Sequence, residues 1–288
     1  MPLIELQDGR SIAYEQSGDP NGVPVLFQHG TGDSRLARHP DEALTTAAGV
    51  RLITADRPGV GGSTRVAERT LLDWSADVES LTAHLGIGRF VVVGWSGGGP
   101  HALAVAHRLG DRVSGIVLAS PLAPLDRPGA RDLVLNKDLR EIWGLRHAKW
   151  VAALAGRIES RSARKDPDAF VAELAKSAPA DAPVLTDPGL EPMFAAEMDE
   201  ALAQHGSGVL DDMWAFLDWG FNPEEVTQPV ALFLGDADEI LAPDMYRGLA
   251  ERLPGAGPPR EWPGGGHYAL FARERWRELM EAAAAFGG

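Results

Sequence analysis

Short apolar runs alternate with stretches of helical spacing from Met1 to Ser120. Runs rich in Val, Ile and Leu predict strands, and they fall at 2–6, 11–16, 25–28, 50–55, 90–93 and 113–119. Longer segments whose apolar residues recur every three or four positions predict helices, at 36–48, 71–85 and 100–109. Strands that alternate with helices in this way form a mostly parallel sheet covered by helices on both faces.

The alternation stops between Leu122 and Gln228, where no β run is convincing. Residues with helical spacing fill this segment, and it far exceeds the dozen residues that a crossover between parallel strands needs. We therefore expect an α-helical cap, or lid, inserted after the sixth strand. The alternation then resumes, with strands expected at 230–234 and 259–262 and helices at 243–253 and 271–286. The predicted organisation is a core domain of residues 1–121 and 229–288 and a cap domain of residues 122–228.

The sequence Gly94-Trp95-Ser96-Gly97-Gly98 joins the strand expected at 90–93 to the helix that follows it. A G-x-S-x-G motif between a strand and a helix is the pattern of a nucleophile elbow, whose tight turn lifts the serine hydroxyl to the carboxyl edge of the sheet. Side chains at the two flanking positions would collide with the neighbouring strand and helix, so glycine is needed there. Ser96 is therefore the candidate nucleophile.

A base and an acid that suit this serine are found further along the chain. His267 follows the glycines at 264–266, in a loop after the last expected strand. A serine hydroxyl is a weak nucleophile and needs such a base beside it. The strand expected at 230–234 ends in Asp236 and Asp238, and either carboxylate is a candidate partner for the histidine. The chain order Ser, Asp, His is that of α/β-hydrolases rather than of the other serine hydrolase folds.

The chain resembles the α/β-hydrolase superfamily over nearly its whole length, on these residues together with Gln28-His29-Gly30-Thr31 and Asp56-Arg57-Pro58-Gly59. The resemblance implies an α/β-hydrolase fold, with a mostly parallel eight-stranded sheet flanked by helices. It also implies that Arg57 has a structural role, paired with a nearby acid, and that His29 braces the loop after the third strand.

The same resemblance implies a catalytic triad of Ser96, His267 and Asp238. Asp238 matches the family's Gly-x-x-Asp position, whereas Asp236 directly follows the glycine and suits a turn-stabilising role. Some relatives carry the acid after the sixth strand, but that position has no carboxylate in this chain. The oxyanion hole is then expected at two backbone amides, those of Gly97 and Thr31.

Composition narrows the classes of partner. The 288 residues carry a net charge of −14, whereas nucleic-acid binding needs clustered Lys and Arg, so we expect neither a nucleic-acid nor a membrane partner. Cysteine is absent, no His, Asp or Glu cluster has metal-ligand spacing, and the glycines at 97–99 match no phosphate or dinucleotide loop. We therefore expect no metal and no cofactor. No signal-peptide pattern or transmembrane stretch is present, which predicts a cytoplasmic protein.

The cap is expected to shape the substrate pocket. Four tryptophans fall within it, and most are expected to pack the cap against the core. Tentative pocket residues are Trp95, Trp143, Trp214 and Trp219. The basic residues between Gly156 and Lys165 are expected to form a solvated helix face rather than an anion site. The run from Glu197 to Glu200 is expected to be exposed, with binding of a substrate amine as the alternative.

These features predict a serine hydrolase that cleaves a small ester or lactone through an acyl-enzyme. An aminopeptidase or amide hydrolase is the nearest alternative, although prolyl-aminopeptidase-like relatives carry a tryptophan after the serine, where Gly97 stands. Dehalogenase and epoxide hydrolase chemistry are disfavoured because they need an aspartate at Ser96. A lyase or cyclase on a natural-product scaffold and a non-catalytic small-ligand receptor stay open. The expected partner is a small-molecule substrate, and the sequence does not decide between monomer and homodimer.

Overall fold

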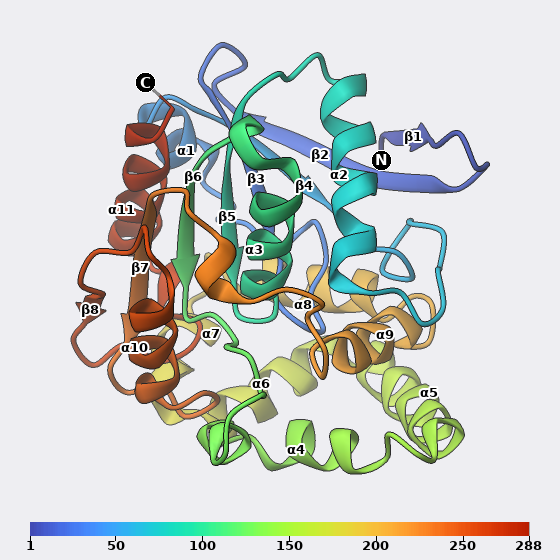
Figure 1. Cartoon of the computed structure of the whole chain (residues 1–288). Helices are drawn as coiled ribbons and strands as arrows, with labels where there is room; N and C mark the ends of the chain where they lie inside the picture. The colour runs from blue at the N-terminus through green and yellow to red at the C-terminus, as the bar shows by residue number, and fades with distance from the viewer. Residues whose placement is uncertain (288) are drawn as a thin grey trace.

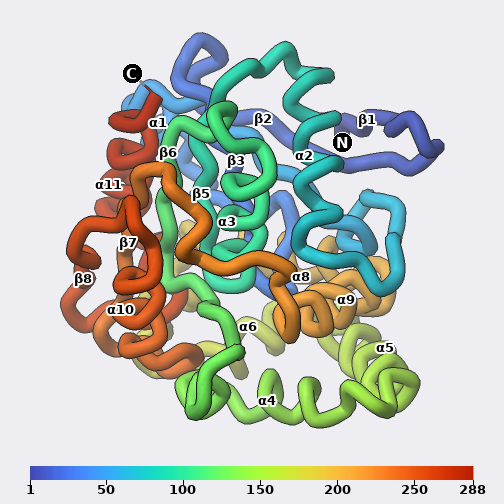
Figure 2. The backbone as a smooth tube through the Cα atoms, in the orientation of Figure 1, coloured from blue at the N-terminus to red at the C-terminus, as the bar shows by residue number. Residues whose placement is uncertain are grey.

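An eight-stranded sheet forms the centre of the structure, a computed structural model that describes residues 1–287. The strands are β1 (Leu3–Glu5), β2 (Ser11–Gly18), β3 (Val23–Gln28), β4 (Val50–Ala55), β5 (Phe90–Trp95), β6 (Val113–Ala119), β7 (Val230–Gly235) and β8 (Arg260–Trp262). They stand in the order β1-β2-β4-β3-β5-β6-β7-β8, and Figure 2 shows β1 and β8 at opposite edges. β1 and β2 pair antiparallel with their neighbours, and the other pairings are parallel.

Helices cover both faces of this sheet, as its sequence predicts. α2 (Leu71–His84), α3 (Gly98–Leu109) and α10 (Pro243–Arg252) share one apolar cluster with the strands, and α1 (Glu42–Ala47) and α11 (Arg273–Ala285) share the other (Figure 1). Every residue of β5 is buried, which is the reason that a strand inside a parallel sheet reads as one continuous apolar run. The mostly parallel, helix-flanked sheet is confirmed.

The helix expected at 36–48 is only half present. α1 begins at Glu42, and Asp41 caps it by accepting a hydrogen bond from the backbone N–H of Ala43. Pro40 disfavours helical backbone at His39, and the backbone N–H of Arg35 bonds to Asp56 instead of to a helix. The apolar spacing was therefore misleading at the start of this segment, where proline and tertiary contacts decide the backbone.

Between β6 and β7 the described chain contributes helices and no strand to the sheet. These helices are α4 (Lys137–Gly144), α5 (Lys149–Lys165), α6 (Pro167–Ser177), α7 (Ala182–Leu185), α8 (Glu191–Ala201) and α9 (Ser207–Ala215). We call residues 122–228 the insertion. Figure 1 shows its helices gathered below the carboxyl ends of the parallel strands. The insertion is thus placed beside the edge of the sheet at which the elbow lies.

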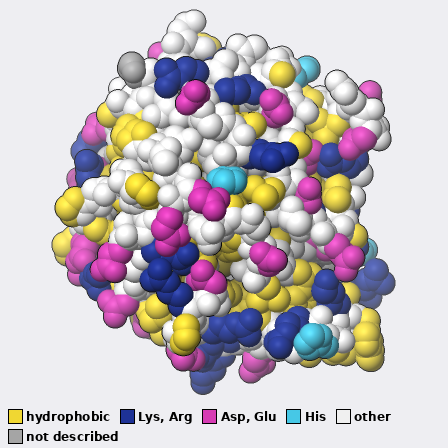
Figure 3. Space-filling view, in the orientation of Figure 1, with side chains coloured by type: hydrophobic (Ala, Val, Ile, Leu, Met, Phe, Trp, Pro, Cys, Tyr) yellow, Lys and Arg dark blue, Asp and Glu magenta, His cyan; other side chains and the backbone are white. Residues whose placement is uncertain are grey.

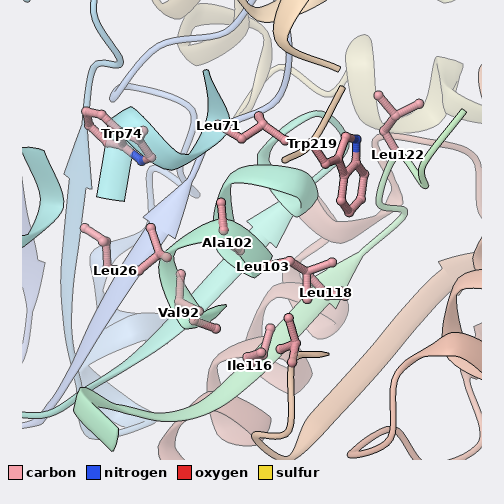
Figure 4. Packing of buried hydrophobic residues seen from close by; sticks show 14 of the residues in the cluster. Leu26, Leu71, Trp74, Val92, Ala102, Leu103, Ile116, Leu118, Leu122 and Trp219 are labelled. Carbon is pink, nitrogen blue, oxygen red and sulfur yellow. The ribbon is translucent and has the colours of Figure 1, made fainter. Parts of the chain in front are cut away.

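The two ends of the insertion pack into the core of the sheet. Figure 4 shows Trp219 and Leu122 beside Leu118 of β6 and Leu103 of α3, and all four side chains are buried in the same cluster. Buried side chains of this kind each contribute about 1.5–3 kcal/mol to stability. The insertion is therefore anchored at both ends by ordinary core packing.

No helix within residues 1–287 is long and apolar enough to span a lipid bilayer.

Candidate active site

Ser96 occupies a strained turn between β5 and α3. Its φ is +53°, a left-handed conformation that costs of order 1–3 kcal/mol for a residue other than glycine. A Cβ at Gly94 would lie 2.7 Å from the carbonyl oxygen of Gly98, and one at Gly98 would collide with the carbonyl oxygen of Gln28 in β3. The motif therefore folds as the tight strand–turn–helix elbow that its spacing indicates, with a half-buried serine at the apex.

The structure brings Ser96, His267 and Asp238 into one hydrogen-bonded chain. The Nε2 atom of His267 lies 2.8 Å from the Oγ atom of Ser96, and its Nδ1 atom lies 2.7 Å from Oδ2 of Asp238. The other candidate acid, Asp236, accepts a hydrogen bond from the backbone N–H of Gly264 at 2.6 Å and closes the turn there. Of the two carboxylates, Asp238 is the one that contacts the histidine.

Asp238 is held in place by three further donors. The backbone N–H groups of Ile240 and Leu241 donate to Oδ1 at 2.8 and 2.9 Å, and the hydroxyl of Tyr246 donates to Oδ2 at 2.5 Å. Burial would raise the pKa of this carboxyl, but His267 and these hydrogen bonds outweigh burial and lower it. Asp238 is therefore ionised and fixed in direction. Tyr246, from α10, has no motif around it, so sequence reasoning missed it.

The charge around His267 favours its protonated form. Burial by itself would lower the pKa of the imidazole, but the carboxylates of Asp238, Asp181 and Asp33 outweigh burial, and its pKa is raised. A histidine in this setting can take a proton from a serine hydroxyl, and the neighbouring carboxylate stabilises the imidazolium that forms. The arrangement has the hydrogen-bonding order of an activated serine nucleophile.

Two backbone amides next to Ser96 have no acceptor within residues 1–287. They belong to Gly97 and Thr31, and the Oγ1 atom of Thr31 stands so close to Gly97 that it occupies the space a Cβ would need. An oxyanion hole requires free donors aimed at the position where negative charge develops. The structure therefore places both predicted amides at the elbow, with their donors available.

A buried ion cluster supports the loop that carries Thr31. Arg57 is fully buried and donates to the carbonyl oxygens of His29 and Gly30, each at 2.7 Å. It also pairs with Asp212 of α9 at 2.9 Å, and Arg69 pairs with the same carboxylate. Although burial raises a carboxyl pKa, these two arginines hold the pKa of Asp212 well below its usual range. The insertion thereby fixes the peptides that precede Thr31, and Arg57 has the structural role expected of it.

His29 and His101 lie close to this cluster and are uncharged at neutral pH, with one proton on each ring. Burial, reinforced by the charge of Arg57, lowers the pKa of His29 well below its usual value and that of His101 to about 4. The Nδ1 atom of His29 lies 2.9 Å from the carbonyl oxygen of Gly30. His29 contributes to the packing of the loop, whereas His101 lies 3.2 Å from Oδ1 of Asp212. His267 is the histidine that contacts the serine.

Asp181 connects the insertion to the loop of His267. It ends a 3-10 turn, Pro179–Asp181, and its fully buried carboxylate accepts from the backbone N–H groups of His267 and Tyr268 at 2.8 and 2.7 Å. Burial raises the pKa of Asp181 to about 6. Because an acid in a helical stretch carries no signal of such a contact, sequence analysis did not single it out. Asp181 both positions the loop and adds negative charge near the imidazole.

Replacing Asp181 by asparagine is expected to move the acidic limb of the pH–rate profile to lower pH. The limb reports protonation of His267, whose pKa is raised in part by the Asp181 charge, so loss of the charge lets the imidazole stay neutral at lower pH. The measurement is kcat/KM for an ester between pH 4 and 9. Glu239→Gln is the matched control, because Glu239 accepts from Ala180 in the same turn but makes no contact with His267. A lower rate without a shift of the acidic limb of the pH–rate profile would show that Asp181 has only a structural role.

The four predicted pocket tryptophans have different surroundings. Trp95 lies beneath the His267 loop and donates to the carbonyl oxygen of His267 at 3.1 Å. Trp143 is buried between α4 and α9 and donates to the carbonyl oxygen of Met213. Trp214 lies at the surface of α9 under the ammonium of Lys149. Trp219 lines a cavity of about 320 Å³. The structure therefore does not gather these four side chains in one pocket.

The cavity at Trp219 has a second wall residue that sequence analysis did not single out. Phe216 also lines this cavity, and its Cζ atom lies 2.9 Å from the position of a Cβ at Gly97. Phe216 thus stands between the cavity and the elbow. Its place in an apolar helix turn gives no sequence signal, because such residues are more often core than pocket.

A pair of buried acids lies beside the loop of Thr31. Asp33 and Glu197 are only 6% and 4% exposed, and neither has a cationic partner within residues 1–287. Burial raises the pKa of Asp33 to about 6 and, with the charge of Asp33, holds that of Glu197 well above its usual value. The expectation that Glu197 is exposed was wrong, because it shares the buried face of α8 with Phe194, Met198 and Ala201. Its carboxylate accepts from the backbone N–H of Ser34 at 3.1 Å.

No group of three or more His, Asp or Glu side chains within the described residues is arranged to hold a metal ion.

Comparison with known proteins gives consistent matches. The family model for the alpha/beta hydrolase fold matches residues 23–274. A proline iminopeptidase of Neisseria meningitidis serogroup A is 35% identical over 118 residues, which are 40% of this chain and 38% of that protein. A non-heme haloperoxidase of Rhodococcus erythropolis is 35% identical over 127 residues, 43% of this chain and 46% of that protein. The chain thus spans less than half the length of either relative.

Among solved structures, the bromoperoxidase from Bacillus anthracis is similar over almost the whole molecule. The TM-score is 0.72 at 25% sequence identity, covering 97% of this chain and 96% of that chain.

Proposed function

The chain belongs to the α/β-hydrolase family, and from that premise we propose that it is a serine hydrolase that cleaves a small ester or lactone through an acyl-enzyme on Ser96. The observation that carries the proposal is the hydrogen-bonded chain from Ser96 through His267 to Asp238. Its members come from three separate segments, and such a meeting of nucleophile, base and acid at one strand edge is typical of acyl transfer.

The proposed reaction has two halves. His267 takes the proton of Ser96 as the hydroxyl oxygen attacks the carbonyl carbon, and the amides of Gly97 and Thr31 receive the oxyanion. The intermediate collapses to an acyl-enzyme and releases the alcohol, which takes its proton from His267. A water molecule deprotonated by His267 then attacks the acyl group, and the carboxylic acid leaves as His267 returns the proton to Oγ of Ser96. Asp238 keeps the Nδ1 proton in place and stabilises the imidazolium.

A series of p-nitrophenyl esters from acetate to octanoate tests this function. We expect turnover of at least the short esters by the wild type, because the donors of the oxyanion site and the base stand at the elbow. The chain-length preference would then give the size of the acyl site. Phe216→Ala opens the wall between Gly97 and the cavity at Trp219. We expect this variant to shift the preference toward esters with longer acyl chains. Absence of turnover with every ester and lactone offered would contradict the proposal.

A second candidate, an aminopeptidase, is favoured by the acid pair Asp33–Glu197. A protonated α-amino group is the kind of cation that two buried carboxyl groups without a counter-charge would bind. One relative that is 35% identical over 118 residues is a proline iminopeptidase. The geometry supports the ester reaction first, because burial raises the pKa of both acids and so disfavours the doubly ionised pair that would bind a cation best.

The same assay separates the two candidates. Proline p-nitroanilide replaces the ester, and Glu197→Gln is compared with wild type on both substrates. An aminopeptidase would lose its rate on the amide in the variant and keep its rate on the ester. An ester hydrolase would show no amide turnover and an ester rate that the variant leaves nearly unchanged. The two candidate functions therefore predict different patterns of rates, and one set of rate measurements distinguishes them.

A further inference from the structure

Helix α5 of the insertion has an inverted apolar pattern. The positions that face the protein are small, Ala152, Ser160 and Ala163, whereas three large apolar side chains face outward. Trp150, Leu154 and Ile158 are 72%, 55% and 61% exposed. Because they are four residues apart, they form one stripe along the helix. Packing against the protein therefore does not explain why these positions are apolar.

The same helix carries a concentration of positive charge that is exceptional for this chain. Five of its residues are basic and one is acidic, Glu159, in a protein whose net charge is −14. Arg157, Arg161 and Lys165 form no ion pair within residues 1–287. Helical spacing puts these three cations beside the apolar stripe on the outward face. Figure 3 shows Lys and Arg gathered along the lower edge of the molecule, over α4 and α5.

We propose that the outer face of α5 docks the protein on an anionic lipid bilayer. A helix that presents a Trp and Leu stripe flanked by Arg and Lys lies in the headgroup region, with the stripe among the acyl chains and the cations at the phosphates. The remainder of the protein is acidic and is repelled by such a surface, but at physiological salt this repulsion fades over about 8 Å. The charge distribution thus selects one orientation, with the insertion toward the lipid.

A second copy of the chain fits this face less well. A closed two-fold dimer would bring the same patch of both subunits together, so the cations of one α5 would face those of the other. Trp150 at the first turn, in contrast, suits the boundary between headgroups and acyl chains, where tryptophan is enriched. Charge complementarity therefore favours the bilayer. We expected no membrane partner because the net charge of the sequence is negative. That net charge is an average over the chain, and it conceals the local excess of positive charge on α5.

Sedimentation of the full chain with vesicles tests the proposal. We expect binding to vesicles made of a mixture of phosphatidylglycerol and phosphatidylcholine, and little binding to vesicles of phosphatidylcholine alone. The partition coefficient for the mixed vesicles should be smaller at high salt. The triple variant Arg157→Gln/Arg161→Gln/Lys165→Gln should lower the partition coefficient roughly a hundredfold, at about fivefold for each charge. Leu154→Ser/Ile158→Ser should lower it by about tenfold or more.

The matched control is Arg89→Gln/Arg108→Gln/Arg277→Gln, which removes the same charge from exposed positions outside the insertion. This variant should bind vesicles as the wild type does, and so should Ser96→Ala, because docking does not depend on the catalytic role of the serine. Failure of the wild type to bind anionic vesicles, or an equal loss in the control, would overturn the proposal. A wild-type dimer in sedimentation velocity that Leu154→Ser/Ile158→Ser dissociates would assign the face to a second copy instead.

Discussion

Replacing Ser96 by alanine is expected to lower kcat for ester hydrolysis by about 10⁶-fold. Without the hydroxyl, His267 has no proton to take and no acyl-enzyme forms, so only the uncatalysed attack of water near the free amides of Gly97 and Thr31 is left. The fold should be unaffected, since alanine removes one partly exposed hydroxyl. The measurement is the steady-state rate on the best p-nitrophenyl ester, with the melting temperature recorded in parallel.

Ser114→Ala is the matched control for this change. Ser114 lies in β6, and its hydroxyl bonds to the carbonyl oxygen of Phe90, away from the elbow. Its rate should stay within about a factor of two of wild type, because its hydroxyl contacts neither the triad nor the elbow within residues 1–287, and loss of this half-buried hydrogen bond costs only about 1 kcal/mol of stability. A Ser96→Ala enzyme that kept the wild-type rate would show that another group performs the chemistry.

Replacing Asp238 by asparagine is expected to lower kcat by about 10⁴-fold. Oδ1 of Asp238 accepts from two backbone N–H groups, so the amide oxygen of asparagine takes that place and the NH₂ group faces Nδ1 of His267. The imidazole must then carry its proton on Nε2, where it can no longer accept the proton of Ser96. The loss should appear in kcat rather than in the melting temperature.

Asp236→Asn is the control that separates the two candidate acids. Asp236 closes a turn through the N–H of Gly264, a bond that the amide oxygen of asparagine can also accept. We expect a rate within a few-fold of wild type. A larger loss of kcat for Asp236→Asn than for Asp238→Asn would reverse the assignment of the acid.

The strands and the elbow could be predicted because their physical causes are local. β5 is buried on both faces, so each of its residues must be apolar or small, and the run is visible without any partner strand. The Ser96 turn excludes side chains at two fixed positions, which leaves a pattern of glycines. The roles of Ser96, Asp238 and His267 then followed from the resemblance, and the distances between them agree with it.

The contacts between the insertion and the site could not be predicted, because they join residues far apart in the sequence. Asp181 meets the backbone of His267, and Asp212 meets Arg57, each across more than 80 positions. An acid in a helical segment reads as a solvated residue unless its partner is known, and this explains the wrong expectation for Glu197. The same reasoning treated the basic run of α5 as a solvated face, although its apolar neighbours are exposed as well.

The intact mass of the protein after treatment with a fluorophosphonate tests the central claim most directly. This reagent phosphonylates a serine only when a neighbouring base activates its hydroxyl, and the distance of 2.8 Å between Ser96 and His267 provides that base. We predict one adduct on the wild type, located on the peptide that contains Ser96, and none on Ser96→Ala. A wild type that gains no adduct, or a Ser96→Ala variant that gains the same one, would contradict the account.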